Sequence, residues 1–348
     1  MSSAVDAIRA HAARATPGTV LTGLIGAGIG PSLSPPLHET EARRLGMDLV
    51  YARFDLDELD VPATAVGPLL TAAREAGYSG LNITHPCKQV VVEHLDELSP
   101  DAAALAAVNT VVFERGRAVG HNTDWSGFAR GLRTGLPEVA LGSVVLLGAG
   151  GAGAAVAHGL LTAGAGRVQV FDLDASRATE LAAALADRFG AGRASAGAGL
   201  GTVVGGRSGV GRASAGSDPE AAVGDRFRAG RASAGADLEA ALSAADGLVH
   251  ATPTGMAAHP GLPVPAGLLR PDLWIAEVVY RPLETELVRA ARAVGARVLD
   301  GGRMAVFQAA EAFALFTGAE PDAARMARHF ATLTETTPAE RQPADVLD

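Results

Sequence analysis

Lysine is almost absent from this sequence of 348 residues: Lys88 is the only one, and arginine supplies the rest of the 29 basic residues. Cysteine is equally scarce, since Cys87 stands alone. A single cysteine excludes an internal disulfide framework and a cysteine-rich zinc site, and it is typical of a reducing cytoplasm. The net charge of −9 and the lack of a dense basic run argue against nucleic acid or an anionic membrane as a partner.

Signals for metal binding, export and membrane insertion are also missing. The nine histidines are scattered without His-x-x-x-His or His-x-x-Glu-His spacing, so we expect no metal site. The N-terminal stretch "MSSAVDAIRAHAARATPG" has no apolar core of signal-peptide length, which predicts a cytoplasmic protein. The stretch from Val139 to Leu161 carries no formal charge, but "GAGGAG" interrupts it. We interpret it as a buried strand, a turn and a helix, not as a membrane span.

Apolar, strand-like runs alternate along the chain with segments rich in Ala, Leu and Glu, which favour helices. This alternation, with 48% hydrophobic residues to build cores, predicts an α/β protein with parallel sheets in two domains. A predicted hairpin, "VVFERGRAVG", interrupts the alternation, and we place the domain boundary near residue 125. The strand-like runs cover residues 20–26, 49–56, 80–84, 108–123, 143–148, 167–172, 247–252 and 273–280.

Residues 190–236 differ in composition from the rest of the chain. The segment "GRASAG" occurs three times, at 192–197, 211–216 and 230–235, with a constant offset of 19 residues. The region is rich in Gly, Ala, Ser and Arg and has few large apolar residues to bury, so we expect a low-complexity tandem insert on the surface. A domain tolerates such an insert because closure entropy rises slowly with loop length. An arginine-lined partner site is the alternative.

The segment "VVLLGAGGAG" predicts a dinucleotide-binding turn. Gly148, Gly150 and Gly153 have G-x-G-x-x-G spacing directly after a strand and at the start of an Ala-rich helix. The first glycine permits the tight turn, the second lets the backbone approach a pyrophosphate, and the third allows close helix packing. Asp172, at the end of the next strand, is placed to accept hydrogen bonds from the ribose hydroxyls of adenosine.

The end of that strand favours NAD over NADP. In "FDLDASRA", Asp172 and Asp174 present two carboxylates, which repel the additional 2′-phosphate of NADP. Arg177 follows closely and can stack on the adenine face. We therefore expect NAD as the cofactor.

A series of further motifs follows along the chain: "SLSPPLHE", "GLNITHPCKQ", "AVNTVV", "GHNTDWSGF", "GAGGAG", "ATPTGM", "VVYRPLETEL" and "GGRMAVFQAAEAF". In this order they resemble the shikimate/quinate dehydrogenase family. The resemblance covers nearly the whole chain apart from the N-terminal arm, the tandem insert and the C-terminal tail. "GLNITHP", "DLDASRA" and "RPLETEL" are most similar to the NAD-using quinate/shikimate branch of the actinobacteria.

The resemblance implies that Lys88 and Asp124 are the catalytic pair, from the motifs "NITHPCK" and "NTD". Oxidation of a secondary alcohol needs a base for the hydroxyl proton while hydride leaves the same carbon. A lysine beside a carboxylate in a partly dehydrated cleft can take part in that proton transfer. The sequence leaves open which of the two holds the proton, and a structural ion pair is the alternative.

The substrate contacts are implied in the same way. Ser32 and Ser34 match a pair of hydroxyls that bind the acid group, and on extended backbone these alternate residues would face the same way. Without the resemblance they would be ordinary turn formers. Tyr280 would close the pocket near the carboxylate. The family's contacts to the ring hydroxyls, which supply the fixed polar groups that such a ring needs, match Asn82, Thr84, Asn109 and Gln308.

The cofactor contacts of the family match residues of the second domain. Thr252, Pro253 and Met256 correspond to a loop that borders the cofactor, and Gly301 to a backbone contact with nicotinamide. The complete implied set is Gly148, Ala149, Gly150, Gly151, Ala152, Gly153, Asp172, Arg177, Thr252, Pro253, Met256, Val278 and Gly301.

Some positions depart from the family pattern. His250 stands where Asn often precedes "ATPTGM", Cys87 fills a variable position, and Arg303 replaces a common Gly. None of these changes removes a catalytic group. Quinate-preferring relatives often carry Thr at the position of Ser34, whereas shikimate-preferring relatives carry Ser, so the preferred substrate remains open.

The resemblance thus implies an N-terminal α/β substrate domain over residues 18–123, completed by helices at 303–335, and a Rossmann NAD-binding domain over 124–302. The active site would be the cleft at their junction. The implied reaction is the reversible NAD-dependent oxidation of quinate or shikimate to the 3-dehydro acid by a monomer or homodimer. One alternative is an NADP-dependent biosynthetic shikimate dehydrogenase. A homologue that only senses the acid is another, although the intact Lys88, Asp124 and "GAGGAG" argue against it.

Overall fold

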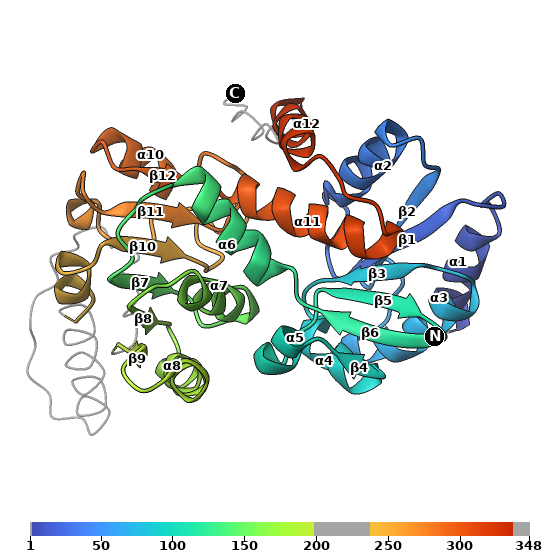
Figure 1. Cartoon of the computed structure of the whole chain (residues 1–348), viewed down its shortest axis with the longest axis horizontal. Helices are drawn as coiled ribbons and strands as arrows, with labels where there is room; N and C mark the ends of the chain where they lie inside the picture. Colours follow the sequence, from blue (N-terminus) through green and yellow to red (C-terminus); the bar gives the residue numbers. More distant parts are fainter. Residues whose placement is uncertain (1, 198–236, 337–348) are drawn as a thin grey trace, which may run out of the picture. The chain divides into compact units, whose positions relative to one another are not determined.

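The computed structural model describes residues 2–197 and 237–336, and the chain divides into two compact units (Figure 1). The first unit runs to Gly127 and resumes at Gly302, and the second comprises Phe128–Gly301. Each unit contains one six-stranded sheet, and the predicted α/β class is confirmed. Within the described ranges, no helix is both long and apolar enough to cross a membrane.

The first unit has a mixed sheet with the strand order β2-β1-β3-β5-β6-β4. Strand β1 pairs in parallel with β2 and β3, whereas β5 pairs antiparallel with β3 and β6. The predicted hairpin is therefore confirmed as β5 and β6. Its turn residues Arg115 and Gly116 both have positive φ, 50° and 79°, which suits the twist of a two-residue hairpin.

The strands of this unit are β1 (Val20–Gly26), β2 (Leu49–Asp55), β3 (Gly80–Ile83), β4 (Glu97–Leu98), β5 (Thr110–Glu114) and β6 (Arg117–His121). Its helices are α1 (Ser2–Ala12), α2 (Ser34–Arg44), η1 (Ala63–Ala65), α3 (Val66–Glu75), α4 (Cys87–Val90), η2 (Val91–His94), α5 (Pro100–Leu105) and α12 (Ala323–Thr336). Two further helices, α6 (Asp124–Gly135) and α11 (Gly301–Thr317), contribute residues to both units.

Two apolar layers hold this sheet. Helices α1 and α3 contribute Ile8 and Leu69 to a core that contains Ile25 and Leu81 of the strands. In a second cluster, α11 contributes Phe313 beside β1 and β2. Burial of such side chains contributes roughly 1.5–3 kcal/mol each.

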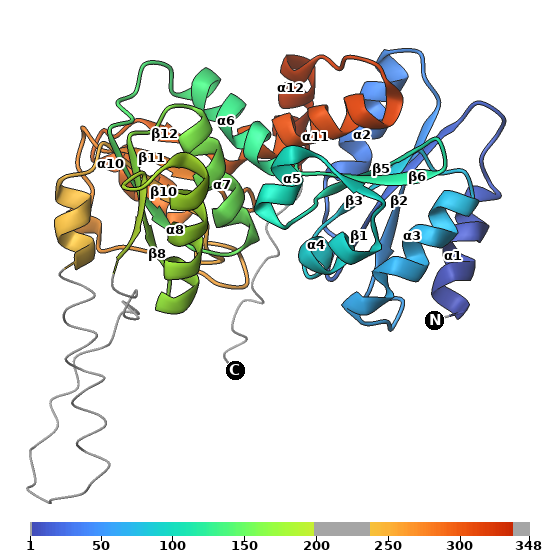
Figure 2. The same cartoon turned by 60° about the horizontal axis from the view of Figure 1, so that its bottom comes forward.

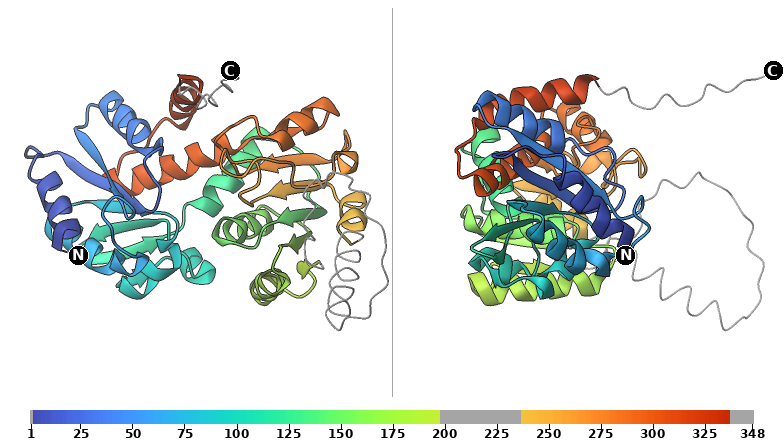
Figure 3. Two further views of the ribbon diagram at one scale, coloured as in Figure 1. Left: turned by 180° about the vertical axis from the view of Figure 1, so that it is seen from behind. Right: turned by 90° about the vertical axis from the view of Figure 1, so that its right-hand side faces the viewer.

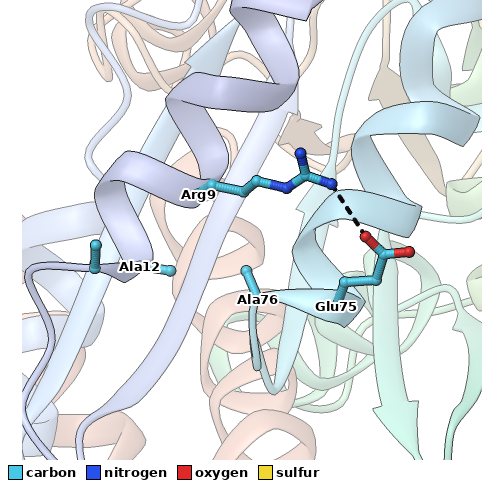
Figure 4. Close-up of a pocket in the computed structure, with 5 residues that line it drawn as sticks. Arg9, Ala12, Glu75 and Ala76 are labelled. Atoms are coloured by element: carbon cyan, nitrogen blue, oxygen red, sulfur yellow. Dashed lines mark hydrogen bonds and ion pairs between the residues drawn. The ribbon is translucent and has the colours of Figure 1, made fainter.

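Helix α1 lies in the N-terminal arm, which is outside the motifs of the sequence, and it packs on α3 (Figures 2 and 3). Ile8 is fully buried, and the Nδ1 atom of His11 is 3.0 Å from the hydroxyl of Tyr78. Arg9 donates to Glu75 over 3.2 Å beside a pocket of about 490 Å³. Figure 4 shows this contact and the residues that line the pocket. Only residues of the α1 and α3 region line this pocket, so it contains none of the predicted site residues.

The second unit has a parallel sheet with the order β12-β11-β10-β7-β8-β9 (Figure 1). Counted along the chain, this is the 3-2-1-4-5-6 order of dinucleotide-binding sheets, which bind their ligand at the carboxyl ends of the strands where the order reverses. Its elements are β7 (Ser143–Leu147), α7 (Gly151–Thr162), β8 (Arg167–Phe171), α8 (Ala175–Phe189), β9 (Ala194–Ala196), a helix over 237–243, β10 (Gly247–His250), η3 (Ala266–Leu268), β11 (Trp274–Glu277), α10 (Glu286–Ala293) and β12 (Val298–Leu299).

The expectation of a surface insert from residue 190 is wrong for its first residues, because β9 is an edge strand that pairs with β8. Small side chains permit this position: a Cβ atom on Gly197 would lie 2.1 Å from the ring of Phe171. Arg193 also donates to the carbonyl of Ala165 over 2.6 Å. The second and third copies of "GRASAG" lie outside the described residues.

Candidate active site

Lys88 and Asp124 form an ion pair in the first unit, with 2.5 Å between Lys88 Nζ and Asp124 Oδ2. Lys88 lies in α4, which follows β3, and Asp124 is the first residue of α6. The two side chains are 23% and 10% exposed. The pair is therefore partly dehydrated, which strengthens its electrostatic interaction, yet a small molecule can still reach it.

A hydrogen-bond network fixes the orientation of the Asp124 carboxylate. Asn109 Nδ2 donates to Asp124 Oδ1 over 2.9 Å and to the Thr123 hydroxyl over 3.0 Å. Asn109 Oδ1 in turn accepts from the Thr123 backbone N–H over 2.7 Å. Because Oδ1 is held in this way, Oδ2 faces Lys88. Sequence reasoning missed the part played by Thr123, although it lies within "GHNTDWSGF".

The side chain of Asn82 also makes its hydrogen bonds within the protein. Its amide donates to the carbonyl of Asn109 and to the hydroxyl of Thr110, and its Oδ1 accepts from the Tyr51 hydroxyl over 2.8 Å. Both amide protons of Asn82 and of Asn109 are thus engaged inside the protein. A substrate hydroxyl could still donate to the second lone pair of Asn82 Oδ1.

The remaining predicted ring contacts lie in the same unit. Thr84 is half-buried at the end of β3, and its methyl group lies against Gly26. Gln308 lies on α11, where its side chain donates to the carbonyl of Ala305 over 3.0 Å. A Cβ atom on Gly127 would lie only 2.7 Å from the backbone nitrogen of Gln308, so this glycine lets α11 approach the first turn of α6.

Ser32 and Ser34 do not lie on extended backbone, so the geometric expectation for them is wrong. Leu33 between them has φ −89° and ψ −1°, and Ser34 is the first residue of α2. The Ser32 hydroxyl accepts from the backbone N–H of Ser34 over 3.3 Å. Pro35 favours this helix start, because proline suits the first helical turn. Both hydroxyls therefore lie at the positive end of a helix, which attracts a carboxylate.

A buried carboxylate supports the loop that leads to these serines. Asp55 accepts from the backbone N–H of Gly28 over 2.9 Å and from that of Ile29 over 2.7 Å. Its side chain lies at the end of β2, next to β1 in the sheet. The sequence did not single out Asp55, because the contact joins residues from two different strand ends.

The glycine-rich turn of the second unit can hold a pyrophosphate. Gly148 has φ 102°, and a Cβ atom there would lie 2.5 Å from the carbonyl oxygen of Ala251. A Cβ atom on Gly153 would lie 2.0 Å from the carbonyl oxygen of Gly148. Gly150 precedes α7 without a side-chain cap, so the N-terminal N–H groups of that helix can serve an anion.

Asp172 lies beside this turn at the end of β8. Its Oδ2 accepts from the Ala149 backbone N–H over 2.6 Å, and its Oδ1 from that of Asp174 over 3.0 Å. Hydrogen bonds from the Ser176 side chain and backbone lower the pKa of Asp174, which keeps its carboxylate charged. Arg177 Nη2 lies 3.1 Å from the place that a Cβ atom on Gly150 would occupy.

Other predicted cofactor residues gather at neighbouring strand ends of the second unit. A Cβ atom on Gly148 would lie 3.1 Å from Thr252, which follows β10. The Val278 backbone N–H donates to the carbonyl of His250 over 3.0 Å, and a Cβ atom on Gly301 would lie 2.6 Å from the carbonyl of Val278. Pro253 accepts from the Met256 backbone N–H, which closes the turn after Thr252.

Tyr280 also lies in the second unit and is 38% exposed. Its predicted place near the substrate carboxylate stays a prediction. Among the residues that the structure describes, no group of three or more His, Cys, Asp or Glu side chains is arranged to hold a metal ion.

Comparison with known proteins identifies relatives of this chain. Residues 24–111 match the family model described as shikimate dehydrogenase substrate binding domain. Shikimate dehydrogenase (NADP(+)) of Streptomyces avermitilis is 56% identical over 92% of this chain and 98% of its own. Quinate/shikimate dehydrogenase (NAD(+)) of Corynebacterium efficiens is 46% identical over 90% of this chain and 99% of its own.

A solved structure is similar over the same extent. Quinate dehydrogenase from Corynebacterium glutamicum in complex with NAD is 43% identical, with a TM-score of 0.76 over 90% of this chain and 99% of that one. Relatives of this identity and coverage are oxidoreductases that use a nicotinamide dinucleotide. The chain therefore belongs to the shikimate/quinate dehydrogenase family.

Proposed function

We propose that this protein catalyses the reversible, NAD-dependent oxidation of quinate or shikimate to the corresponding 3-dehydro acid, with Lys88 and Asp124 as its catalytic residues. The observation that carries this proposal is the 2.5 Å contact between Lys88 Nζ and Asp124 Oδ2, with Asp124 Oδ1 held by Asn109. An oriented, partly exposed pair of this kind can take the proton of a substrate hydroxyl.

The pair has two tasks in the oxidation. One of its members accepts the hydroxyl proton, and the positive charge of Lys88 stabilises the negative charge that develops on the oxygen. In the reverse direction the same pair returns a proton to the carbonyl oxygen. Ser32 and Ser34 bind the acid group at the N-terminus of α2, where the helix dipole favours an anion.

The second unit provides a site that fits the cofactor. Gly148, Gly150 and Gly153 leave room for the pyrophosphate at the start of α7. Thr252 and Gly301 follow β10 and β12 of the same sheet. The bound nicotinamide supplies the acceptor for the hydride.

NAD is the cofactor that the residues around Asp172 favour. Each oxygen of Asp172 accepts one backbone N–H and retains a lone pair that a ribose hydroxyl can use. Asp174 adds a second carboxylate two residues further on, and hydrogen bonds from Ser176 lower its pKa. The relative of known structure from Corynebacterium glutamicum is in complex with NAD, which supports this assignment.

A specific observation also favours a second candidate. The Streptomyces avermitilis and Arthrobacter relatives, 56% and 50% identical, are shikimate dehydrogenases named for NADP. The second candidate is therefore an NADP-dependent shikimate dehydrogenase with the same catalytic pair.

Steady-state kinetics with quinate and shikimate, each with NAD and with NADP, separates the two candidates. The proposal expects the higher kcat/KM with NAD for at least one of the two acids. Higher kcat/KM with NADP for both acids would support the second candidate. Absence of turnover in all four combinations would contradict both.

A further inference from the structure

The second unit contains a buried histidine–glutamate pair that the proposed reaction does not use. His250 is the last residue of β10, Glu277 is the last residue of β11, and the two are direct partners in the parallel ladder. His250 Nδ1 is 2.9 Å from Glu277 Oε1 and 3.1 Å from Oε2. Both side chains are 0% exposed.

The Glu277 carboxylate accepts hydrogen bonds from residues that follow β11 in the chain. Its Oε1 accepts from the backbone N–H of Val279 over 2.9 Å. Its Oε2 accepts from the Thr285 hydroxyl over 3.0 Å, and that hydroxyl also accepts the Val288 N–H at the start of α10. A buried carboxylate requires several donors, because without them its dehydration would be strongly unfavourable.

His250 extends the network to the β10 side. Its Nε2 is 2.5 Å from the Thr252 hydroxyl, which accepts the Thr254 backbone N–H over 3.3 Å. One arrangement of protons satisfies every contact: Nδ1–H donates to Glu277, and the Thr252 hydroxyl donates to Nε2. The hydrogen bonds then run in one continuous chain, in which each bond strengthens its neighbours.

The chain of bonds joins two segments at the carboxyl edge of the sheet. On one side is the loop Thr252–Met256, which packs on Gly148 of the glycine-rich turn. On the other is Val279, whose carbonyl would be 2.4 Å from a Cβ atom on Gly301. Backbone hydrogen bonds close this loop on itself, from the Met256 N–H to the Pro253 carbonyl and from the Gly255 N–H to the His259 carbonyl. The Thr252 hydroxyl joins the closed loop to His250.

We propose that His250 and Glu277 are positioning residues that hold the loop Thr252–Met256 in the conformation that binds the nicotinamide dinucleotide. This inference rests on the proposed function, because it takes the loop to border the cofactor. His250 does not touch the cofactor itself, since it is fully buried and acts through the Thr252 hydroxyl.

The test measures NAD dissociation constants of His250→Asn, Thr252→Val and the double variant by calorimetry. Asn keeps an N–H group near the position of Nδ1 but leaves nothing at Nε2, and Val removes only the hydroxyl of Thr252. Each single variant should weaken NAD binding about fivefold or more. The double variant should bind NAD as tightly as the single variants do, because each substitution breaks the same contact between His250 and Thr252. His250→Gln, whose amide oxygen reaches the Nε2 position, should restore part of the affinity.

A merely structural role would lower the melting temperature without changing NAD affinity of the folded protein. His158→Asn is the matched control, because His158 is also a buried histidine of the second unit, on α7, where its ring packs against Phe189 of α8. It should lower stability and leave NAD affinity within about twofold of the wild type. All variants should retain the wild-type KM for the acid.

The outcomes separate this inference from the proposed function. If Thr252→Val weakens NAD binding but His250→Asn and His250→Gln do not, the positioning role is wrong and the cofactor site stands. Effects that add in the double variant would also overturn the inference.

If Thr252→Val binds NAD normally, the loop does not depend on this contact and the inference fails. The kinetics of the unmodified protein still test the reaction in that case. If His250→Asn fails to fold, the comparison of His250→Gln with Thr252→Val decides in its place.

Discussion

At the scale of single residues, Lys88 combines two properties that a structural ion pair does not require. It is the only lysine of the sequence, and it contacts a carboxylate whose second oxygen is held by Asn109. Arginine would make a stronger bidentate ion pair with Asp124, and this chain uses arginine everywhere else. Under the proposed function, a lysine is required here because it can exchange a proton, which arginine cannot do.

Two substitutions of Lys88 test this explanation. Lys88→Ala should lower kcat by a factor on the order of 10²–10⁴, the usual contribution of a general acid–base group, and leave NAD affinity nearly unchanged. Lys88→Arg keeps the positive charge but cannot release its proton, so it should lose most of the turnover as well. Steady-state kinetics and NAD calorimetry measure both. Retention of about half the turnover by Lys88→Arg would show that charge alone suffices.

His38 makes the stability of the first unit depend on pH. Burial lowers its pKa from 6.5 to about 3, and neither ring nitrogen has a hydrogen-bond partner among the described residues. The ring is packed beside Tyr51, with 4.8 Å between the ring centroids. In the folded protein His38 is therefore neutral, whereas in the unfolded chain it gains a proton below pH 6.5. The contribution of His38 to the free energy of unfolding is fully present above pH 6.5 and is lost as the pH falls towards 3.

The variant His38→Phe should reduce this acid sensitivity. From pH 7 to pH 5 the group accounts for a loss of about 2 kcal/mol, at roughly 1.4 kcal/mol per pH unit below the unfolded pKa. The melting temperature of the variant should therefore fall less between the two pH values, by a difference of about 4–8 °C. Thermal melts at pH 7 and pH 5 measure it, and equal losses in both proteins would contradict the assignment.

At the scale of elements, the predicted strands agree with the structure because each is a run of buried apolar residues. The runs at 20–26, 143–148 and 273–280 became β1, β7 and β11, whose residues are almost all buried. The elements that the sequence did not indicate are short or lack large side chains. Strands β4 and β12 have two residues each, and β9 consists of Ala and Ser. Such elements depend on tertiary contacts, which a local pattern does not contain.

The packing of α6 against α11 predicts the effect of Gly127→Ala. The new Cβ atom would lie 2.7 Å from the Gln308 nitrogen and must push the helices apart. Asp124 lies one turn earlier on α6, so the change should raise the KM for the acid several-fold and lower the melting temperature, with NAD affinity unchanged. Gly267→Ala is the control, because no atom lies within 4 Å of its new Cβ. Equal kinetics in the two variants would contradict this account.

The tandem repeat allows a deletion that preserves β9. Removal of residues 193–211 joins Gly192 to Arg212 and rebuilds "GAGRASAG", so an identical segment can occupy the edge of the sheet. Folding and turnover should therefore remain nearly unchanged, with the melting temperature within about 2 °C of the wild type. Thermal melts and steady-state kinetics measure the result. A larger fall in either would show that the deleted residues pack or function beyond forming β9.

At the scale of the whole molecule, the site was predictable where its residues lie in compact motifs. The glycines of "GAGGAG" could be read directly, because local backbone demands dictate them. Lys88 and Asp124 were proposed as a pair from the resemblance of their two motifs to the family, and the structure places their side chains in contact. The supports of the site could not be read from the sequence. Asp55 reaches Gly28, and Glu277 reaches His250, through the order and register of strands that are far apart in the sequence. Ser32 and Ser34 were placed on the wrong backbone because proline favours a helix start there.

We expect Asp172 and Asp174 of the second unit to determine the choice between NAD and NADP, which is measured as the turnover of the whole protein. A 2′-phosphate carries close to two negative charges near neutral pH, and beside Asp172 and Asp174 it meets two carboxylates. The ribose hydroxyls of NAD can instead donate to Asp172. Arg177 acts in the opposite direction, because its guanidinium lies near Gly150 and could neutralise part of a phosphate. We expect the carboxylates to dominate, so kcat/KM should favour NAD by at least about tenfold.

The double variant Asp172→Asn, Asp174→Thr tests this balance directly. It removes both negative charges. Asn at position 172 keeps one oxygen for the Ala149 N–H and gives up the bond from the N–H of position 174, while Thr at position 174 can still accept the Ser176 N–H. The start of α8 should therefore persist. The preference should narrow mainly because kcat/KM with NADP rises, and added salt should narrow it in the wild type as well by screening the repulsion. Arg177→Ala in the wild type should widen the preference for NAD, since the guanidinium near Gly150 is then lost. Equal kcat/KM with NAD and NADP in the unmodified protein would show that repulsion by Asp172 and Asp174 does not select the cofactor. A small preference for NAD that Arg177→Ala leaves unchanged would show the same.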